Sequence, residues 1–166
     1  MFGTALSARE IEDLRQESDG SVRLTIVDVT DDQAVRSWVG QTTGELDDHG
    51  LDVLISNAGI LTPGPFEVLP LHAIRHEFEV NVFGSLAVIN AFLPALRRAR
   101  GRIVQLGSAT GKFPLPFNGP SSASKAALEA FADVYRAELK SFGIHFVIVE
   151  PDNIATGGPA ATARAL

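Results

Sequence analysis

Short apolar runs alternate along this chain with longer segments in which apolar residues recur at helical spacing. The short runs are rich in β-branched residues and are bounded by glycine, proline, aspartate or asparagine, which is typical of β-strands. The run at 53–55 is uninterrupted and ends at Ser56, as expected for a parallel strand that is buried on both faces. We therefore predict strands at 22–27, 53–56, 102–106 and 144–149.

The longer segments carry helix start and stop signals as well as apolar periodicity. Ser7 and Glu10 form a capping box, and Thr30 and Gln33 form a second one. Pro94 lies inside the longest segment and predicts an interruption or kink there, because proline removes an internal hydrogen bond. Together these signals predict helices at 7–16, from 30 to just before Gly50, at 71–96 and at 120–141.

Strands that alternate with helices predict a doubly wound, parallel α/β sheet with three layers. At 166 residues, of which 45% are hydrophobic and 20% charged, the chain has the size and composition of a single domain, residues 1–166. In such a sheet, ligands bind outside the carboxyl ends of the strands. The residues that follow each predicted strand are therefore the first candidates for a site.

Composition narrows the possible partners. The formal charge of −6 and the lack of basic runs argue against nucleic acid or an anionic membrane surface as partner. The chain contains no cysteine, which excludes disulfides, thiolate catalysis and cysteine-based zinc sites. His72 and His76 have a possible metal-ligand spacing, but without a third ligand no metal site is predicted. We find no leader-like start and expect no stretch long enough to cross a membrane, so a cytoplasmic location is expected.

The stretch 118–128 begins a predicted helix and carries a lone lysine among small residues. Ser121 and Lys125 stand at positions i and i+4 and so share one helix face. A cation beside a hydroxyl favours the ionised form of that hydroxyl, and carbonyl reduction or alcohol oxidation requires such a tuned proton donor. A helix lysine taken alone is most often solvated, but this pairing indicates proton-transfer chemistry.

The same stretch, from Ser121 through Ser124 and Lys125 to Ala127, resembles the active-site helix of the short-chain dehydrogenase/reductases, whose pattern is Tyr-x-x-x-Lys. The resemblance covers nearly the whole chain. It implies a Rossmann-like fold and an oxidoreductase that uses NAD or NADP and acts on a small-molecule carbonyl or alcohol. It also implies catalytic positions at Asn81, which holds a water leading to the lysine, Ser108, which binds the substrate oxygen, Ser121, in the tyrosine's place, and Lys125.

Cofactor-binding residues at the strand ends follow from the same resemblance. The pair at 28–29 is similar to the family's residues at the adenine ring, and the triplet at 57–59 is similar to the end of its Asn-Asn-Ala-Gly motif. Asp152 departs from the glycine that usually follows the proline at 151. Asn-Ala-Gly alone is an ordinary turn, but five matches in the right order favour the family. The implied positions are Asp28, Val29, Asn57, Ala58, Gly59, Lys125, Pro151 and Thr156.

The chain also departs from the family's pattern. No glycine-rich loop lies between a predicted strand and helix, so the first βαβ unit, whose helix N-terminus binds the pyrophosphate, is expected to be lacking. The sequence resembles the middle of such a domain, cut at both ends. Ser121 is a poor substitute for a phenol with a pKa of about 10. Tyr135 cannot replace it, because it lies about 15 Å along the helix from Lys125 at roughly 1.5 Å per residue.

Two classes of function stay open on the sequence. One is an NAD(P)-dependent oxidoreductase, and the other is a degenerate, non-catalytic member that acts as a binding or interaction module. In the resembled fold two further strands lie between 22–27 and 53–56, and we expect both to be absent. The apolar strand at 53–56 would then expose an unpaired edge, and such an edge tends to recruit another strand. We therefore predict a homo-oligomer, with a second contact surface on the outer face of the helix at 120–141, expected to include Leu128, Phe131, Ala132 and Leu139.

Overall fold

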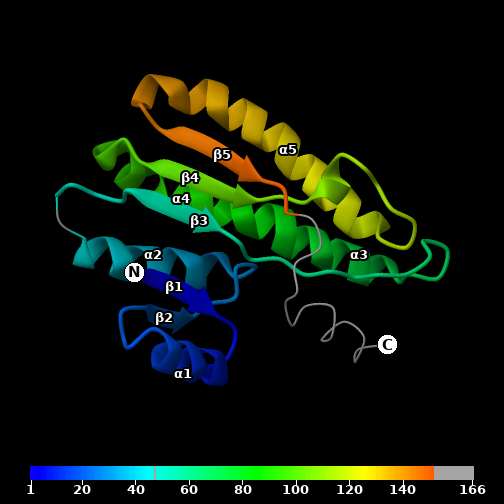
Figure 1. Ribbon diagram of the computed structural model, residues 1–166, viewed down its shortest axis with the longest axis horizontal. Coiled ribbons are helices and arrows are strands. Elements are labelled where there is room, and N and C mark those ends of the chain that lie inside the picture. The colour runs from blue at the N-terminus through cyan, green and yellow to red at the C-terminus, as the bar shows by residue number, and fades with distance from the viewer. Residues whose placement is uncertain (47, 152–166) are drawn as a thin grey trace.

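The computed structural model of the protein describes residues 1–46 and 48–151, with strands and helices in alternation (Figure 1). The strands are β1 (Phe2–Ala5), β2 (Arg23–Ile26), β3 (Val53–Ser56), β4 (Arg102–Leu106) and β5 (His145–Val149). The α-helices are α1 (Ala8–Glu17), α2 (Asp32–Glu45), α3 (Leu71–Phe78), α4 (Ser85–Ala99) and α5 (Gly119–Leu139). Three short helical segments complete the order, namely η1 (Glu79–Gly84), η2 (Ala109–Gly111) and η3 (Lys140–Phe142).

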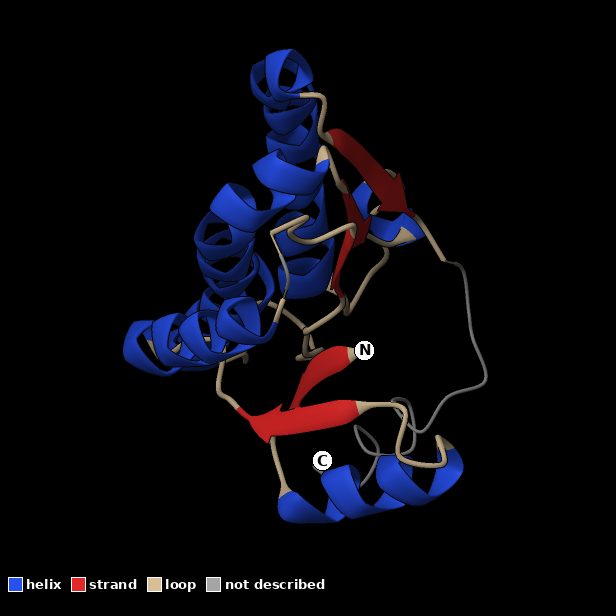
Figure 2. Cartoon of the chain, turned by 90° about the vertical axis from the view of Figure 1, so that its left-hand side faces the viewer, coloured by secondary structure: helices blue, strands red, loops and turns tan. Residues whose placement is uncertain are grey.

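The strands form two parallel groups. β1 pairs with β2, while β3, β4 and β5 form a three-stranded sheet in that order. Figures 1 and 2 both place β1 between β2 and the larger sheet. The long helices gather on one face of the three-stranded sheet, whereas α1 lies against β1 and β2 (Figure 2). The predicted α/β class, with an incomplete Rossmann-like parallel sheet, is confirmed.

β1 was not predicted from the sequence. Phe2 and Thr4 favour a strand, but Gly3 and Ala5 do not. The strand is defined by its parallel register with β2, from Phe2 opposite Arg23 to Ala5 opposite Ile26. We expected two strands to be absent between 22–27 and 53–56, and this expectation is wrong for one of them, because β1 is present beside β2. The described residues begin with a strand-helix-strand unit, and within them β1 does not pair with β3.

Two helix details also differ from the prediction. α2 is capped by Asp31, whose side chain accepts hydrogen bonds from the N–H groups of Gln33 and Ala34, and not by Thr30. α4 continues through Pro94, and the irregular segment is the π-helical η1. A π-turn leaves a carbonyl without its regular helical partner. The Ser85 hydroxyl satisfies the Asn81 carbonyl oxygen at 2.9 Å, which stabilises this turn around Asn81.

The continuous helical run Leu71–Ala99 is apolar enough to cross a membrane by length and composition, with a hydropathy of 1.5, which contradicts the expectation that no such stretch exists. However, 56% of that window is buried inside the protein. Ile89, Phe92 and Leu96 lie in the core, where the Phe92 ring meets the edge of Trp38 with ring centroids 5.1 Å apart. Core packing therefore accounts for the apolar character of this run.

Candidate active site

Lys125 lies near the start of α5, and its ammonium reaches the carboxyl end of β4. Its Nζ donates a hydrogen bond to the carbonyl oxygen of Leu106 at 2.8 Å. Burial lowers the pKa of Lys125, while the negative charge of Glu77 opposes that shift. A Cβ added at Gly111 would lie 3.1 Å from the Lys125 carbonyl carbon, so glycine at 111 lets η2 pack closely on α5. Lys125 is therefore a partly desolvated cation at a strand end.

Asn81, fully buried in η1, joins three parts of the chain. Its Oδ1 accepts from the Ile60 N–H at 2.8 Å, and its Nδ2 donates to the Ile60 carbonyl at 3.0 Å. The same Nδ2 donates to Ser124 Oγ at 3.0 Å, and that hydroxyl donates in turn to the Ser121 carbonyl at 2.8 Å. Asn81 thus fixes the loop after β3 against the first turn of the helix that carries Lys125.

Glu77 extends this network into the protein interior. Its carboxylate accepts from the Thr62 N–H at 2.9 Å and from Asn81 Nδ2 at 3.4 Å, and the residue is fully buried. Burial raises the pKa of Glu77, while the hydrogen bonds from Thr62 and the charge of Lys125 act in the opposite direction. A buried acid and a partly buried base therefore interact electrostatically around Asn81.

The two serines of the predicted catalytic set occupy the neighbouring turns. Ser108 follows β4, two residues after the carbonyl that binds Lys125, and its hydroxyl accepts from the Thr110 N–H at 3.2 Å and from the Thr110 hydroxyl at 3.0 Å. Ser121 is partly buried one helical turn before Lys125. Strand β4 and helix α5 thus bring Ser108, Ser121 and Lys125 to the same end of the sheet as Asn81.

The predicted residues on the cofactor side also come together. Asp28 follows β2, and its Oδ1 accepts from both the backbone N–H and the hydroxyl of Thr30, which lower the pKa of this carboxyl. Gly59 lies against Asn81, because an added Cβ would be 3.2 Å from Asn81 Oδ1. One cavity of about 990 Å³ between β1 and β3 is lined by all five positions, namely Asp28, Val29, Asn57, Ala58 and Gly59.

Known proteins are similar to this chain in sequence and in fold. The sequence model for short chain dehydrogenases matches residues 4–164. The chain belongs to this family. It is 35% identical to retinol dehydrogenase 16 of Mus musculus over 161 residues, which is 95% of the chain and 50% of that relative. It is 31% identical to the NADPH-dependent 3-dehydrocapnine reductase of Ornithobacterium rhinotracheale, over 94% of the chain and 57% of that relative.

A solved structure of a short-chain dehydrogenase from Streptomyces avermitilis is similar to this short-chain dehydrogenase chain with a TM-score of 0.85 and 31% identity. The superposition covers 93% of the chain and 57% of that structure. The chain spans about half the length of the curated relatives it matches. The ligands and activities of the full-length relatives are therefore proposals for this chain.

The described residues fit part of a nicotinamide dinucleotide. Asp28 and residues 57–59 line the cavity where a nucleoside could bind. In contrast, the helices that follow β1 and β2 carry carboxylates at their starts. Glu10 accepts from the N–H groups of Leu6 and Ser7, and Asp31 accepts from those at the start of α2. A helix N-terminus binds a pyrophosphate through free N–H groups. These two helix starts already hold an acid, so they do not fit that anion.

Sequence reasoning missed Glu77, Ser124, and the Ile60 and Leu106 carbonyls. The available signal was a carboxylate one turn before Asn81, on the buried side of a helix.

Pro151 accepts a hydrogen bond from the Ala109 N–H at 3.4 Å, and the predicted site residue Thr156 lies outside the described residues. Within residues 1–46 and 48–151, no group of three or more potential metal ligands is found.

Replacing Glu77 with glutamine is expected to change how stability depends on pH. Because the folded pKa of Glu77 is raised above its usual value of 4.5, the stability it contributes is complete below that value and is lost as pH rises through the folded pKa. The unfolding free energy of the wild type relative to Glu77→Gln should therefore fall as pH rises above 4.5. Urea unfolding of both proteins measures this difference. Glu79→Gln, at an exposed neighbouring position, is the control for the loss of one carboxylate.

Proposed function

We propose that this site serves the interconversion of an alcohol and a carbonyl, with NAD or NADP as the hydride carrier. The observation that carries the proposal is the position of Lys125, a partly desolvated cation that is hydrogen-bonded to the carboxyl end of β4 and interacts electrostatically with Glu77 of the Asn81 network. Ser108 binds the oxygen of a small-molecule substrate, and Lys125 favours the ionised form of a hydroxyl placed at position 121.

Ser121 limits the rate of this reaction. An aliphatic hydroxyl is much less acidic than a phenol, and its oxygen lies closer to the helix backbone than a tyrosine oxygen would. Tyr135 does not compensate, because its hydroxyl donates to Asn90 Oδ1 at 2.7 Å and its ring stacks on Phe146. These two observations favour a second candidate function, a non-catalytic member of the family that acts as a binding or interaction module.

Weak binding of the dinucleotide is the expected result for this chain. Asp28 and residues 57–59 can contact the nucleoside, but the Glu10 carboxylate lies at the start of α1, where its negative charge would repel a pyrophosphate. Calorimetric titration with NADH and NADPH should show no saturation below about 0.1 mM. A dissociation constant in the low micromolar range would contradict this expectation and would favour an intact cofactor site.

We further propose a cytoplasmic homo-oligomer that binds neither nucleic acid nor membrane. The expected contact face on α5 needs correction, because Leu128, Ala132 and Leu139 are buried in the protein and Phe131 is the exposed member of that set. Val134, which is 52% exposed, extends the apolar surface beside it. Sedimentation as a stable monomer of 17.7 kDa would contradict the oligomer, and recovery with membranes after cell fractionation would contradict the location.

A further inference from the structure

Two main-chain hydrogen bonds tie the turn that follows β4 to the carboxyl end of β5. The Gly107 N–H donates to the Val149 carbonyl at 2.8 Å, and the Ala109 N–H donates to the Pro151 carbonyl at 3.4 Å. The two donors flank Ser108 in the sequence. The backbone position of Ser108 therefore depends on the end of β5, which we treat below as one half of a clamp on this turn.

Glu150, the residue between the two acceptors, makes a further connection to the same turn. Its Oε1 accepts a hydrogen bond from Lys112 Nζ, and Lys112 directly follows η2. The two side chains are 27% and 52% exposed, so solvent screens this ion pair and the pair alone contributes little to stability. Its effect is to hold the Glu150 carboxylate next to the turn that carries Ser108.

A second carboxyl group packs against the turn from the side of α5. Glu129 Oε1 is buried and finds no hydrogen-bond donor within residues 1–46 and 48–151. A Cβ added at Gly107 would lie 3.2 Å from this oxygen, so Glu129 lies directly beside the residue before Ser108. A buried carboxylate oxygen without a donor is costly, which favours the protonated form of Glu129.

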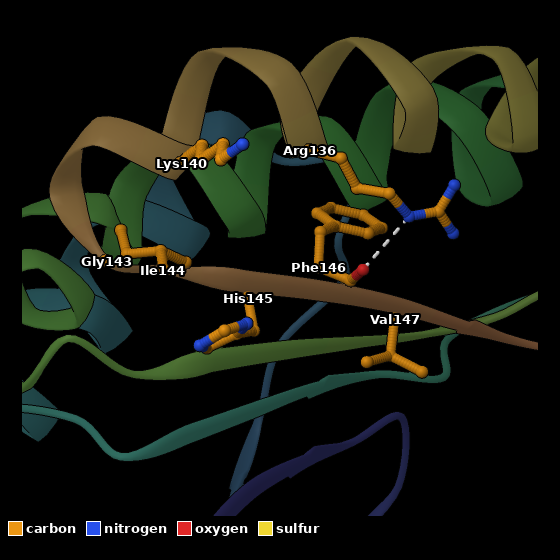
Figure 3. A pocket seen from close by; sticks show the side chains of 7 residues that line it. All are labelled: Arg136, Lys140, Gly143, Ile144, His145, Phe146 and Val147. Atoms are coloured by element: carbon orange, nitrogen blue, oxygen red, sulfur yellow. Dashed lines mark hydrogen bonds between the residues drawn. The ribbon is translucent and has the colours of Figure 1, made fainter.

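The charges around Glu129 come from three elements. Burial raises the pKa of Glu129, and so do the negative charge of Glu150 and a hydrogen bond between the two carboxyl groups. The positive charges of Lys112 and Arg136 act in the opposite direction. Arg136 Nε donates to the Phe146 carbonyl at 3.1 Å, and its guanidinium points along β5, away from Lys140 (Figure 3). Two cations therefore limit the repulsion between the carboxyl groups without removing it.

We propose that Glu129 and Glu150 hold one proton between them and act as positioning residues for Ser108, whose turn loosens when that proton leaves to water. Two adjacent carboxylates repel each other. Glu129 is fixed on α5, so the repulsion acts on the end of β5, whose carbonyls hold the N–H groups on both sides of Ser108. The role of Ser108 in binding the substrate oxygen rests on the proposed function, whereas the carboxyl pair does not.

Amide hydrogen exchange of the 166-residue chain, followed by NMR as the pH rises from 4.5, tests the proposal. After correction for the intrinsic effect of pH on exchange, the amides of Gly107 and Ala109 should lose protection by about tenfold as Glu129 ionises. The amide of Val104, in the middle of β4, should keep its protection. The titration of Glu129 itself is read from its side-chain carboxyl carbon.

The matched variants are Glu129→Gln and Glu138→Gln, both on α5. Glutamine at 129 stays neutral and can still donate to Glu150, so the protection at Gly107 and Ala109 should hold at every pH. Glu138 is exposed, and its replacement should leave the wild-type behaviour unchanged. Protection that stays constant while Glu129 ionises, or a loss that persists in Glu129→Gln, would overturn the positioning of Ser108.

Glu150→Gln tests the pairing of the two carboxyl groups separately. Removing the neighbouring negative charge should lower the pH at which Glu129 ionises, and Lys112→Met, which removes a cation, should raise it. An unchanged titration of Glu129 in Glu150→Gln would overturn the shared proton. None of these measurements requires turnover, so an inactive enzyme would count against the proposed function and not against the carboxyl pair.

Discussion

Replacing Ser121 with tyrosine is expected to raise the rate of carbonyl reduction by about 10²-fold, provided that the dinucleotide is supplied at about 1 mM to offset its weak binding. The new phenol would stand one helical turn before Lys125, whose ammonium lies at the end of β4. A positioned proton donor of this kind contributes about 10² to 10⁴ in rate. Absorbance of the reduced nicotinamide, followed with a generic ketone, measures the effect.

The matched control for this variant is Ser121→Tyr combined with Lys125→Met. Without the cation the phenol keeps its ordinary acidity, so the double variant should return to the wild-type rate. Saturation of the single variant at micromolar dinucleotide would contradict weak cofactor binding, whereas no turnover by a folded variant at any concentration would favour the non-catalytic function.

Asn81→Ala is expected to cost about 3 kcal/mol or more of unfolding free energy, because buried partners left without a hydrogen bond cost about 1–3 kcal/mol each. The change removes the bonds to the Ile60 N–H and carbonyl and to Ser124 Oγ. It also removes a donor to the buried Glu77 carboxylate. Chemical denaturation measured near neutral pH reports the loss.

Asn90→Ala is the control, because it removes an asparagine side chain that lies outside the buried network. Asn90 lies exposed on α4 and accepts one hydrogen bond, from the Tyr135 hydroxyl. Its replacement should cost about 1 kcal/mol or less. Equal losses in the two variants would mean that the Asn81 network does not hold the site together.

The regular elements were predictable where local patterning agrees with the final structure. β3, β4 and β5 are apolar runs with clear turn residues at their ends, and each lies within one or two residues of its predicted bounds. β1 was not predictable, because its stability comes from pairing with β2, which lies about 20 residues away in the sequence. Because proline lacks an N–H group, we predicted the helix irregularity at Pro94, whereas in the structure it lies at η1.

The candidate site was predictable in its residues but not in its connections. Motif positions such as Asn81 and Lys125 are readable from spacing, but their hydrogen bonds to Ile60 and Leu106 use main-chain carbonyls, which carry no signature in sequence. Whether an apolar residue of α5 faces the core or the solvent depends on the angle at which the helix packs. That angle buries Leu128 and exposes Phe131, three positions later.

The most direct test of the account follows one hydrogen atom. Ser121→Tyr is incubated with a ketone and NADPH that carries deuterium at the transferable position, at about 1 mM, and the alcohol product is analysed by mass spectrometry. The account predicts an alcohol with one deuterium on the former carbonyl carbon, and at most a trace when Lys125→Met is added. Unlabelled product, or equal labelling with and without Lys125, would contradict the claim that this lysine site serves alcohol–carbonyl interconversion.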